Sequence, residues 1–264
     1  MIALKKIGLL ILLLSNTIFA VACTSPTTFQ AGPFFSTSLI IRFWQPFTIA
    51  LQESTACETN IKTSPDYTAY LKNILNKEND IYVVPDHYVS ALQDLGYKPI
   101  LASHKTAQIY FVSRHPLKHG NLKALHGDVI TVPSEYTRAY LELKSWLKTN
   151  GVFDKVTFDF NHSHDSAAML MLKGERSSTV ILASIYDKLP NFIQDKFSVV
   201  KLNAHAGAYL MANETLNTDI INGMIKSLGK LNFQSWHKVE TVPDEPYSDE
   251  FRAQLSKFKQ THKL

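Results

Sequence analysis

The stretch from Gly127 to Gly151 constrains the fold of this chain more than any other part of the sequence. Val129 to Val132 is a short β-branched run, Pro133-Ser134 interrupts it, and apolar residues then recur at helical spacing over 139–147. This pattern predicts a strand, a polar loop and a helix. Such a loop presents free backbone N–H groups and the positive end of the helix dipole to an anion, although most strand-loop-helix units bind nothing.

The residues before this stretch alternate between strand and helix patterns. Strands are predicted at 27–31, 60–63 and 80–84, and helices at 67–75 and 88–95. Another helix follows Ser36, and its apolar face comprises Leu39, Ile40, Phe43, Trp44, Phe47 and Leu51. The order β-α-β-α-β-α predicts a parallel sheet with right-handed crossovers.

The alternation continues to the C-terminus without a flexible linker or an internal repeat. Further strands are predicted at 99–102, 108–112, 129–132, 155–160, 178–183, 197–202 and 207–212. Helices are predicted at 122–127, 139–147, 166–173, 185–189 and 215–228, and an extended tail follows. We therefore expect an α/β fold of two lobes joined by crossing strands, each lobe a mainly parallel sheet flanked by helices. The expected boundaries are 27–103 plus 204–264 for lobe 1 and 104–203 for lobe 2.

The N-terminus has the pattern of a secretory signal peptide. Lys5-Lys6 precede an apolar run over 7–14, and the small residues Ala20-Val21-Ala22 stand directly before Cys23. Residues 1–22 are therefore expected to be removed. Loss of two of the 27 Lys and Arg residues leaves 25 against 23 acidic residues, a net charge of +2. This balance gives no compositional support for nucleic-acid binding.

The two cysteines, Cys23 and Cys57, admit two interpretations. Each lies a few residues before a predicted parallel strand, and neighbouring strands lie about 5 Å apart, so their lead-in segments can meet within the reach of a disulfide. Alternatively, the small residues before Cys23 form a lipobox, with Ala in place of the usual Leu, and the mature chain is lipid-anchored. We favour the disulfide.

Several motifs resemble the PhnD-like group of periplasmic substrate-binding proteins, which serve importers of phosphate, phosphite and phosphonate. They lie at Gly32-Pro33 with Trp44 to Phe47, at 79–88, at Leu125 to Val129, and at Ser163 to Ala167 before Gly174-Glu175. The resemblance implies a type II periplasmic-binding fold, in which two lobes close on a ligand. It also implies a periplasmic protein that captures a small anionic solute for an ABC transporter permease.

Donors for such an anion are expected on loops that follow strands, and both lobes supply candidates. The candidate ligand-binding residues are Tyr67, Asp86, His87 and Tyr88 from lobe 1, and Ser134, Tyr136, Thr137, Arg138, His164 and Tyr186 from lobe 2. In the loop that resembles the family's serine- and threonine-rich segment, Thr137 is kept while Tyr136 and Arg138 replace serines. Arg138 either offers a bidentate fork to the anion or points into solvent.

Other functions have weaker support. His162, His164 and Asp165 could bind zinc in a periplasmic metal-binding protein, although their spacing is imperfect, and Asp165 more readily caps the following helix. Ser134, His164 and Asp165 supply the residue types of a catalytic triad, but adjacent His and Asp cannot easily orient each other, so we expect no enzyme. A receptor that feeds a membrane sensor would share the same fold. We expect a monomer without a cofactor.

Overall fold

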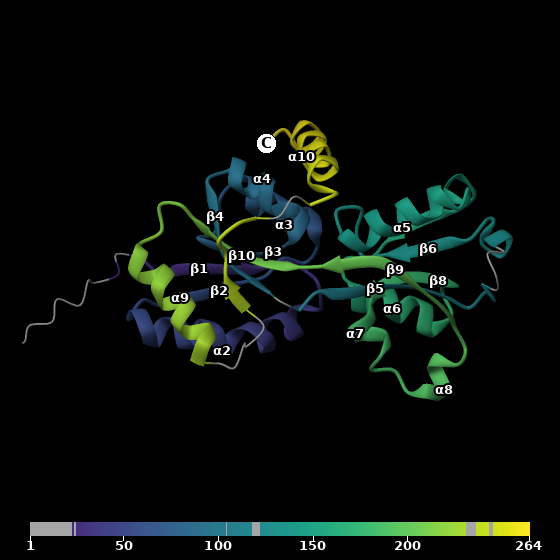
Figure 1. The fold of residues 1–264 in the computed structure, drawn as a ribbon, viewed down its shortest axis with the longest axis horizontal. Helices are drawn as coiled ribbons and strands as arrows, with labels where there is room; N and C mark the ends of the chain where they lie inside the picture. Colours follow the sequence, from purple (N-terminus) through teal and green to yellow (C-terminus); the bar gives the residue numbers. More distant parts are fainter. Residues whose placement is uncertain (1–22, 24, 104, 118–121, 231–235, 243–244) are drawn as a thin grey trace, which may run out of the picture.

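The computed structural model describes residues 23, 25–103, 105–117, 122–230, 236–242 and 245–264. The expected signal peptide at 1–22 lies outside the described residues. Two α/β lobes stand side by side along the long axis of the molecule, and strands cross between them (Figure 1). Among the described helices, none has the length and hydropathy to traverse a bilayer.

The sheet of lobe 1 has six strands in the order β11-β4-β10-β3-β1-β2. Their bounds are Thr27–Ala31 (β1), Thr59–Lys62 (β2), Ile81–Pro85 (β3), Tyr97–Ser103 (β4), Ala208–Asn213 (β10) and Trp236–Lys238 (β11). The strands β2, β1 and β3 are parallel, as the alternation over 27–95 predicts. Strand β10 pairs antiparallel with both β3 and β4, and β11 pairs antiparallel with β4.

Helices cover both faces of this sheet. One face packs against α2 (Thr37–Thr55) and α9 (Thr218–Lys230), and the other against α3 (Tyr67–Leu75), α4 (Val89–Asp94) and α10 (Ser248–His262). The side chains of β3 show why both faces must be covered, because Val83 faces the first layer and Tyr82 and Val84 face the second. Strand β3 is consequently buried at every position.

Lobe 2 has a sheet of five strands in the order β7-β6-β8-β5-β9. They are Ala107–Ser113 (β5), Val129–Val132 (β6), Thr157–Phe160 (β7), Ser178–Leu182 (β8) and Ser198–Ala206 (β9). One face packs against α5 (Arg138–Thr149), and the other against α6 (His164–Lys173) and α7 (Ala183–Tyr186), while the short helix α8 spans Asn191–Gln194. Strand β6 is parallel to β7 and β8, and β5 is antiparallel to β8 and β9.

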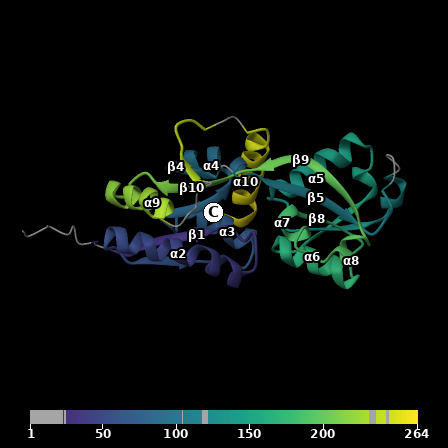
Figure 2. The same ribbon diagram turned by 60° about the horizontal axis from the view of Figure 1, so that its bottom comes forward.

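Both sheets are thus mixed, where the sequence pattern predicted mainly parallel ones. The cause is the chain's passage between the lobes. The chain leaves lobe 1 after β4 and enters lobe 2 along β5, and it returns along β9 into β10 (Figures 1 and 2). The returning strand inserts antiparallel between β3 and β4, and β5 lies antiparallel between β8 and β9.

The C-terminal segment is the second difference from the sequence prediction. An extended tail was expected, but residues 248–262 form α10, whose first turn carries Asp249 and Glu250 and whose buried face carries Phe251, Leu255 and Phe258. This spacing is that of an amphipathic helix. Contacts reach lobe 2 from this helix, because Glu250 pairs with Lys144 at 2.6 Å and Phe258 packs edge-on against Tyr136.

Cys23 and Cys57 form a disulfide in this structure, with their Cα atoms 5.3 Å apart. The bridge lies just before β1 and β2, which are neighbours in register from Thr27 and Thr59. The two cysteines are 34 residues apart in the sequence, and the loop that the bridge closes contains the whole of α2.

Candidate functional site

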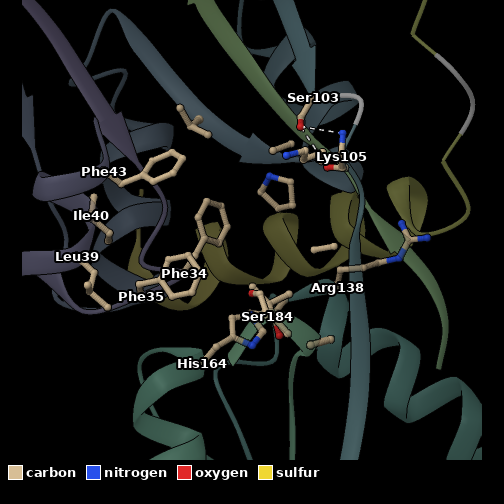
Figure 3. A pocket seen from close by; sticks show the side chains of 18 of the residues that line it. Phe34, Phe35, Leu39, Ile40, Phe43, Ser103, Lys105, Arg138, His164 and Ser184 are labelled. Atoms are coloured by element: carbon tan, nitrogen blue, oxygen red, sulfur yellow. Dashed lines mark hydrogen bonds between the residues drawn. The ribbon is translucent and has the colours of Figure 1, made fainter. Parts of the chain in front are cut away.

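A cleft of about 870 Å³ lies between the lobes. Lobe 1 contributes the segment after β1, the start of α2, Tyr67 and the end of β3, while lobe 2 contributes the first turns of α5 and α6 together with Ser184 (Figure 3). Among the described residues that line it, the charged ones are all cationic: Arg42, Lys105, Arg138 and Lys188. The cleft is therefore electrostatically suited to an anionic or neutral solute.

Three helices from both lobes begin at the cleft. Tyr67 is the first residue of α3, Arg138 of α5 and His164 of α6, and all three line the cleft. The first turn of a helix leaves backbone N–H groups without partners inside the helix, and its dipole places partial positive charge there. Each helix here has nine or more residues, so each contributes such an end.

Each of these three helices is capped by the side chain of the residue that precedes it. Asp66 accepts from Ala69 N at 2.8 Å, Thr137 from Tyr140 N at 3.3 Å and Ser163 from Ser166 N at 3.3 Å. The Thr137 hydroxyl also donates to Ser134 O at 2.8 Å. Thr137, predicted as a ligand donor, therefore lines the cleft with its hydroxyl already bonded in the cap.

Tyr67 and His164 are buried polar side chains at the cleft, and each has an atom without a hydrogen-bond partner among the described residues. These atoms are Tyr67 Oη and His164 Nδ1, and the two residues are only 2% and 3% exposed. Burial lowers the pKa of His164 to about 3, so its imidazole is neutral at pH 7, and burial also raises the pKa of the Tyr67 phenol. A buried polar atom without a partner is costly, which makes both atoms candidates for ligand contact.

Arg138 is neither the ligand fork nor the solvated residue that the sequence allowed. Its guanidinium is bound by three carboxylates, Glu142 at 2.9 Å, Glu245 at 3.3 Å and Asp86 at 3.4 Å, and it stacks over the ring of Tyr247. Figure 3 shows the guanidinium pointing away from the cleft. Arg138 is among the residues that line the cleft, but its charge is neutralised by the ion pairs with Asp86, Glu142 and Glu245.

Asp86, His87 and Tyr88 lie beside the crossing strands and do not line the cleft. Together they form the 3₁₀ helix η1 (Asp86–Tyr88). Asp86 Oδ2 accepts from Gly207 N at 2.8 Å, between β9 and β10, and His87 Nε2 and Tyr88 Oη lie 3.1 and 3.0 Å from Tyr136 O of lobe 2. These three predicted site residues therefore connect the lobes. Burial opposes the charge of Asp86, but His87 and Arg138 hold its pKa below the usual value.

The remaining predicted residues of lobe 2 are also outside the cleft lining. Ser134 Oγ accepts from Tyr136 N at 3.3 Å, and Tyr136 packs against α10. Tyr186 Oη donates to Gln194 O of α8 at 3.0 Å. Of the ten predicted residues, the structure brings Tyr67, Thr137, Arg138 and His164 together at the cleft.

The metal alternative finds no matching geometry at His162, His164 and Asp165. His162 is 68% exposed, with Nδ1 3.9 Å from Asp66, while Asp165 accepts from Ser163 Oγ at 2.7 Å and from Ser36 N at 3.1 Å. No group of three metal-ligating side chains occurs within the part of the chain that the structure describes. Ser163, and not Asp165 as predicted, is the residue that caps α6.

Sequence reasoning missed the apolar wall of the cleft. Its residues are Phe34, Phe35, Leu39, Ile40 and Phe43, hereafter the apolar wall (Figure 3). Leu39 and Phe43 were assigned to the buried face of α2, yet they are 45% and 56% exposed. Phe34-Phe35 lie in the loop after β1, separated from its end by Gly32-Pro33, and that position after a strand was the signal that could have found them.

The whole-chain comparisons agree with this architecture. A family model described as "ABC transporter, phosphonate, periplasmic substrate-binding protein" matches residues 29–234, well over half of the sequence. The chain belongs to this family, whose members are substrate-binding proteins of transporters. A search of curated protein sequences found no significant match.

Solved structures share the fold at low sequence identity. PhnD1 from Prochlorococcus marinus, solved with methylphosphonate, is 14% identical with a TM-score of 0.67, covering 90% of this chain and 98% of its own. A binding-protein component of an ABC phosphonate transporter from Pseudomonas aeruginosa is 14% identical with a TM-score of 0.66, at 89% and 87% coverage. The alkanesulfonate-binding protein SsuA from Xanthomonas axonopodis, bound to MOPS, is also 14% identical, with a TM-score of 0.56 at 92% and 81% coverage. The type II periplasmic-binding fold that the sequence predicted is confirmed.

Proposed function

We propose that this protein captures a solute bearing a small oxyanion, of the phosphonate, phosphite or phosphate class, in the cleft between its lobes. It would deliver that solute, as a monomer, to the permease of an ABC importer. The observation that carries the proposal is the meeting of three helix N-termini at one cleft, beside two buried side chains without partners, Tyr67 and His164.

The chemistry of an oxyanion matches what this part of the cleft lacks. Each phosphonate oxygen accepts hydrogen bonds, while Tyr67 Oη is a donor, and neutral His164 donates from whichever ring nitrogen carries its proton. The first-turn N–H groups of α3 and α5 supply further donors, and their dipoles favour negative charge. The lining holds no carboxylate among the described residues that would repel such a ligand.

The relatives give this proposal its ligand class. The family is that of phosphonate transporters, and the Prochlorococcus protein was solved with methylphosphonate. In this chain, Arg138 is occupied by Asp86, Glu142 and Glu245. We therefore assign charge recognition to the helix ends and hydrogen bonding to Tyr67 and His164.

Isothermal titration calorimetry tests the proposal with methylphosphonate, phosphite, phosphate and sulfate. At least one phosphorus oxyanion should bind, and His164→Phe, which keeps a ring but removes both nitrogens, should weaken binding by about 10-fold or more, the usual effect of removing a charge-assisted hydrogen bond. His126→Phe, on an exposed histidine outside the cleft, is the matched control. Absence of binding by every oxyanion, or equal affinity of both variants and the parent, would remove the cleft from this role.

A further inference from the structure

Two residues of the apolar wall, Leu39 and Phe43, are exposed to solvent at the cleft. The buried face of α2 comprises Ile40, Trp44, Phe47 and Leu51. Leu39 and Phe43 lie beside that face, toward the cleft, and Figure 3 shows them with Phe34 and Phe35 along one side of the cavity. Large apolar side chains gathered in a concave site are typical of a surface that a ligand covers.

The wall is fixed in position relative to the oxyanion donors. Phe34 O accepts from the backbone N–H of His164 at 3.3 Å, which ties the wall segment to the first turn of α6. The ring of Phe34 folds back over Gly32, where an added Cβ would lie 2.9 Å from Cζ. Glycine at this position thus allows the ring to take its place in the cleft beside His164.

The volume of the cleft exceeds what an oxyanion alone can fill. About 870 Å³ lies within the range of pockets that take whole drug-sized molecules. A head group held at Tyr67 and His164 would occupy one part of this space and leave the apolar wall facing water. Ligand surface laid over Phe34, Leu39 and Phe43 would be removed from water together with them.

We propose, on the basis of the oxyanion site above, that the solute is amphiphilic. Its anionic head lies at Tyr67, His164 and the helix ends, and an alkyl or aryl body several carbons long covers the apolar wall. Alkyl- and arylphosphonates of that size fit this chemistry, whereas inorganic phosphate and methylphosphonate leave the wall bare. The cationic residues Lys105, between β4 and β5, and Lys188, after α7, line the same cleft and add to the preference for a negatively charged molecule.

Calorimetry with methyl-, propyl-, butyl- and phenylphosphonate measures how much the body of the ligand contributes to affinity, because the head group is the same in all four. Each methylene that is buried adds about fourfold in affinity, so butylphosphonate, with three more, should bind up to about 60-fold more tightly than methylphosphonate. In Phe43→Ala this gain should shrink by about fourfold or more, and the affinity for methylphosphonate should change less than that for butylphosphonate. Phe43 is 56% exposed, so the variant should fold, and its thermal unfolding verifies this.

Phe192→Ala is the matched control, because Phe192 is 67% exposed on α8, outside the cleft, and its loss should leave the whole series unchanged. Equal affinity for methyl- and butylphosphonate would overturn the amphiphilic ligand and leave the oxyanion site standing. A full gain with chain length in Phe43→Ala would place the body elsewhere and overturn it as well. Failure of every phosphonate to bind would overturn the amphiphilic ligand, and only if phosphite and phosphate also failed would the oxyanion site fall with it.

Discussion

Removal of the Tyr67 hydroxyl should raise the free energy of unfolding of the ligand-free protein and lower its affinity for the ligand. Tyr67 is 2% exposed and its Oη has no partner among the described residues, so the folded state bears the cost of a desolvated hydroxyl. That cost is about 1 to 3 kcal/mol, and Tyr67→Phe should recover about 1 kcal/mol of it in the free energy of unfolding. In the proposed complex, Oη would donate to a charged oxygen, and its loss there should raise Kd by about 10-fold or more.

Urea unfolding without ligand and calorimetry with methylphosphonate measure the two effects separately. Tyr186→Phe is the matched control, because the Tyr186 hydroxyl donates to Gln194 O outside the cleft. That variant should lose about 1 kcal/mol of stability and keep its affinity. If Tyr67→Phe instead loses stability as Tyr186→Phe does, Oη is satisfied in the empty protein. An unchanged Kd would show that it does not reach the ligand.

Three further substitutions test the remaining features of the structure. Burial lowers the pKa of His164 from 6.5 to about 3, so below pH 6.5 the unfolded chain takes up the proton first and stability falls as pH falls. At pH 5 this loss is about 2 kcal/mol relative to pH 7, and urea unfolding of His164→Phe should lack it. Arg138→Ala leaves buried carboxylates unpaired and should cost about 3 kcal/mol or more in the same assay, with methylphosphonate affinity changed less than in Tyr67→Phe; an unaffected stability would contradict the ion network. Cys57→Ser opens the loop of 34 residues and should cost roughly 3 to 4 kcal/mol. Intact mass of the protein from its native envelope checks the bridge itself, because an acylated Cys23 with one free thiol would contradict it.

Local pattern was sufficient where local forces decide the structure. The strand at Thr27–Ala31 and the helix at Tyr67–Leu75 are confirmed, because their signals lie within one turn or one strand. Tyr67 and His164 were also selected as site candidates, since both were placed at loops that follow predicted strands.

The sequence could not show what a side chain meets across the fold. Arg138 was expected in the cleft or in solvent, but Asp86 and Glu245, 52 and 107 residues away, bind its guanidinium. In the same way, the 3.6-residue period placed Leu39 and Phe43 on the buried face of α2. The 3.6-residue period shows which apolar residues lie along one side of a helix, whereas the position of lobe 2 decides which of them face the cleft.

The insertion of β10 between β3 and β4 has a consequence for the order in which the chain can fold. Lobe 2 is one continuous segment from β5 to β9, so all its strands have their partners once residue 206 is available. Lobe 1 is split, and β3 and β4 meet only through β10, more than a hundred residues after β4 begins. Because the chain is synthesised from its N-terminus, lobe 2 can therefore complete its sheet while the sheet of lobe 1 still lacks β10, residues 208–213. Lobe 1 is thus the first lobe to be synthesised and the last to complete its sheet.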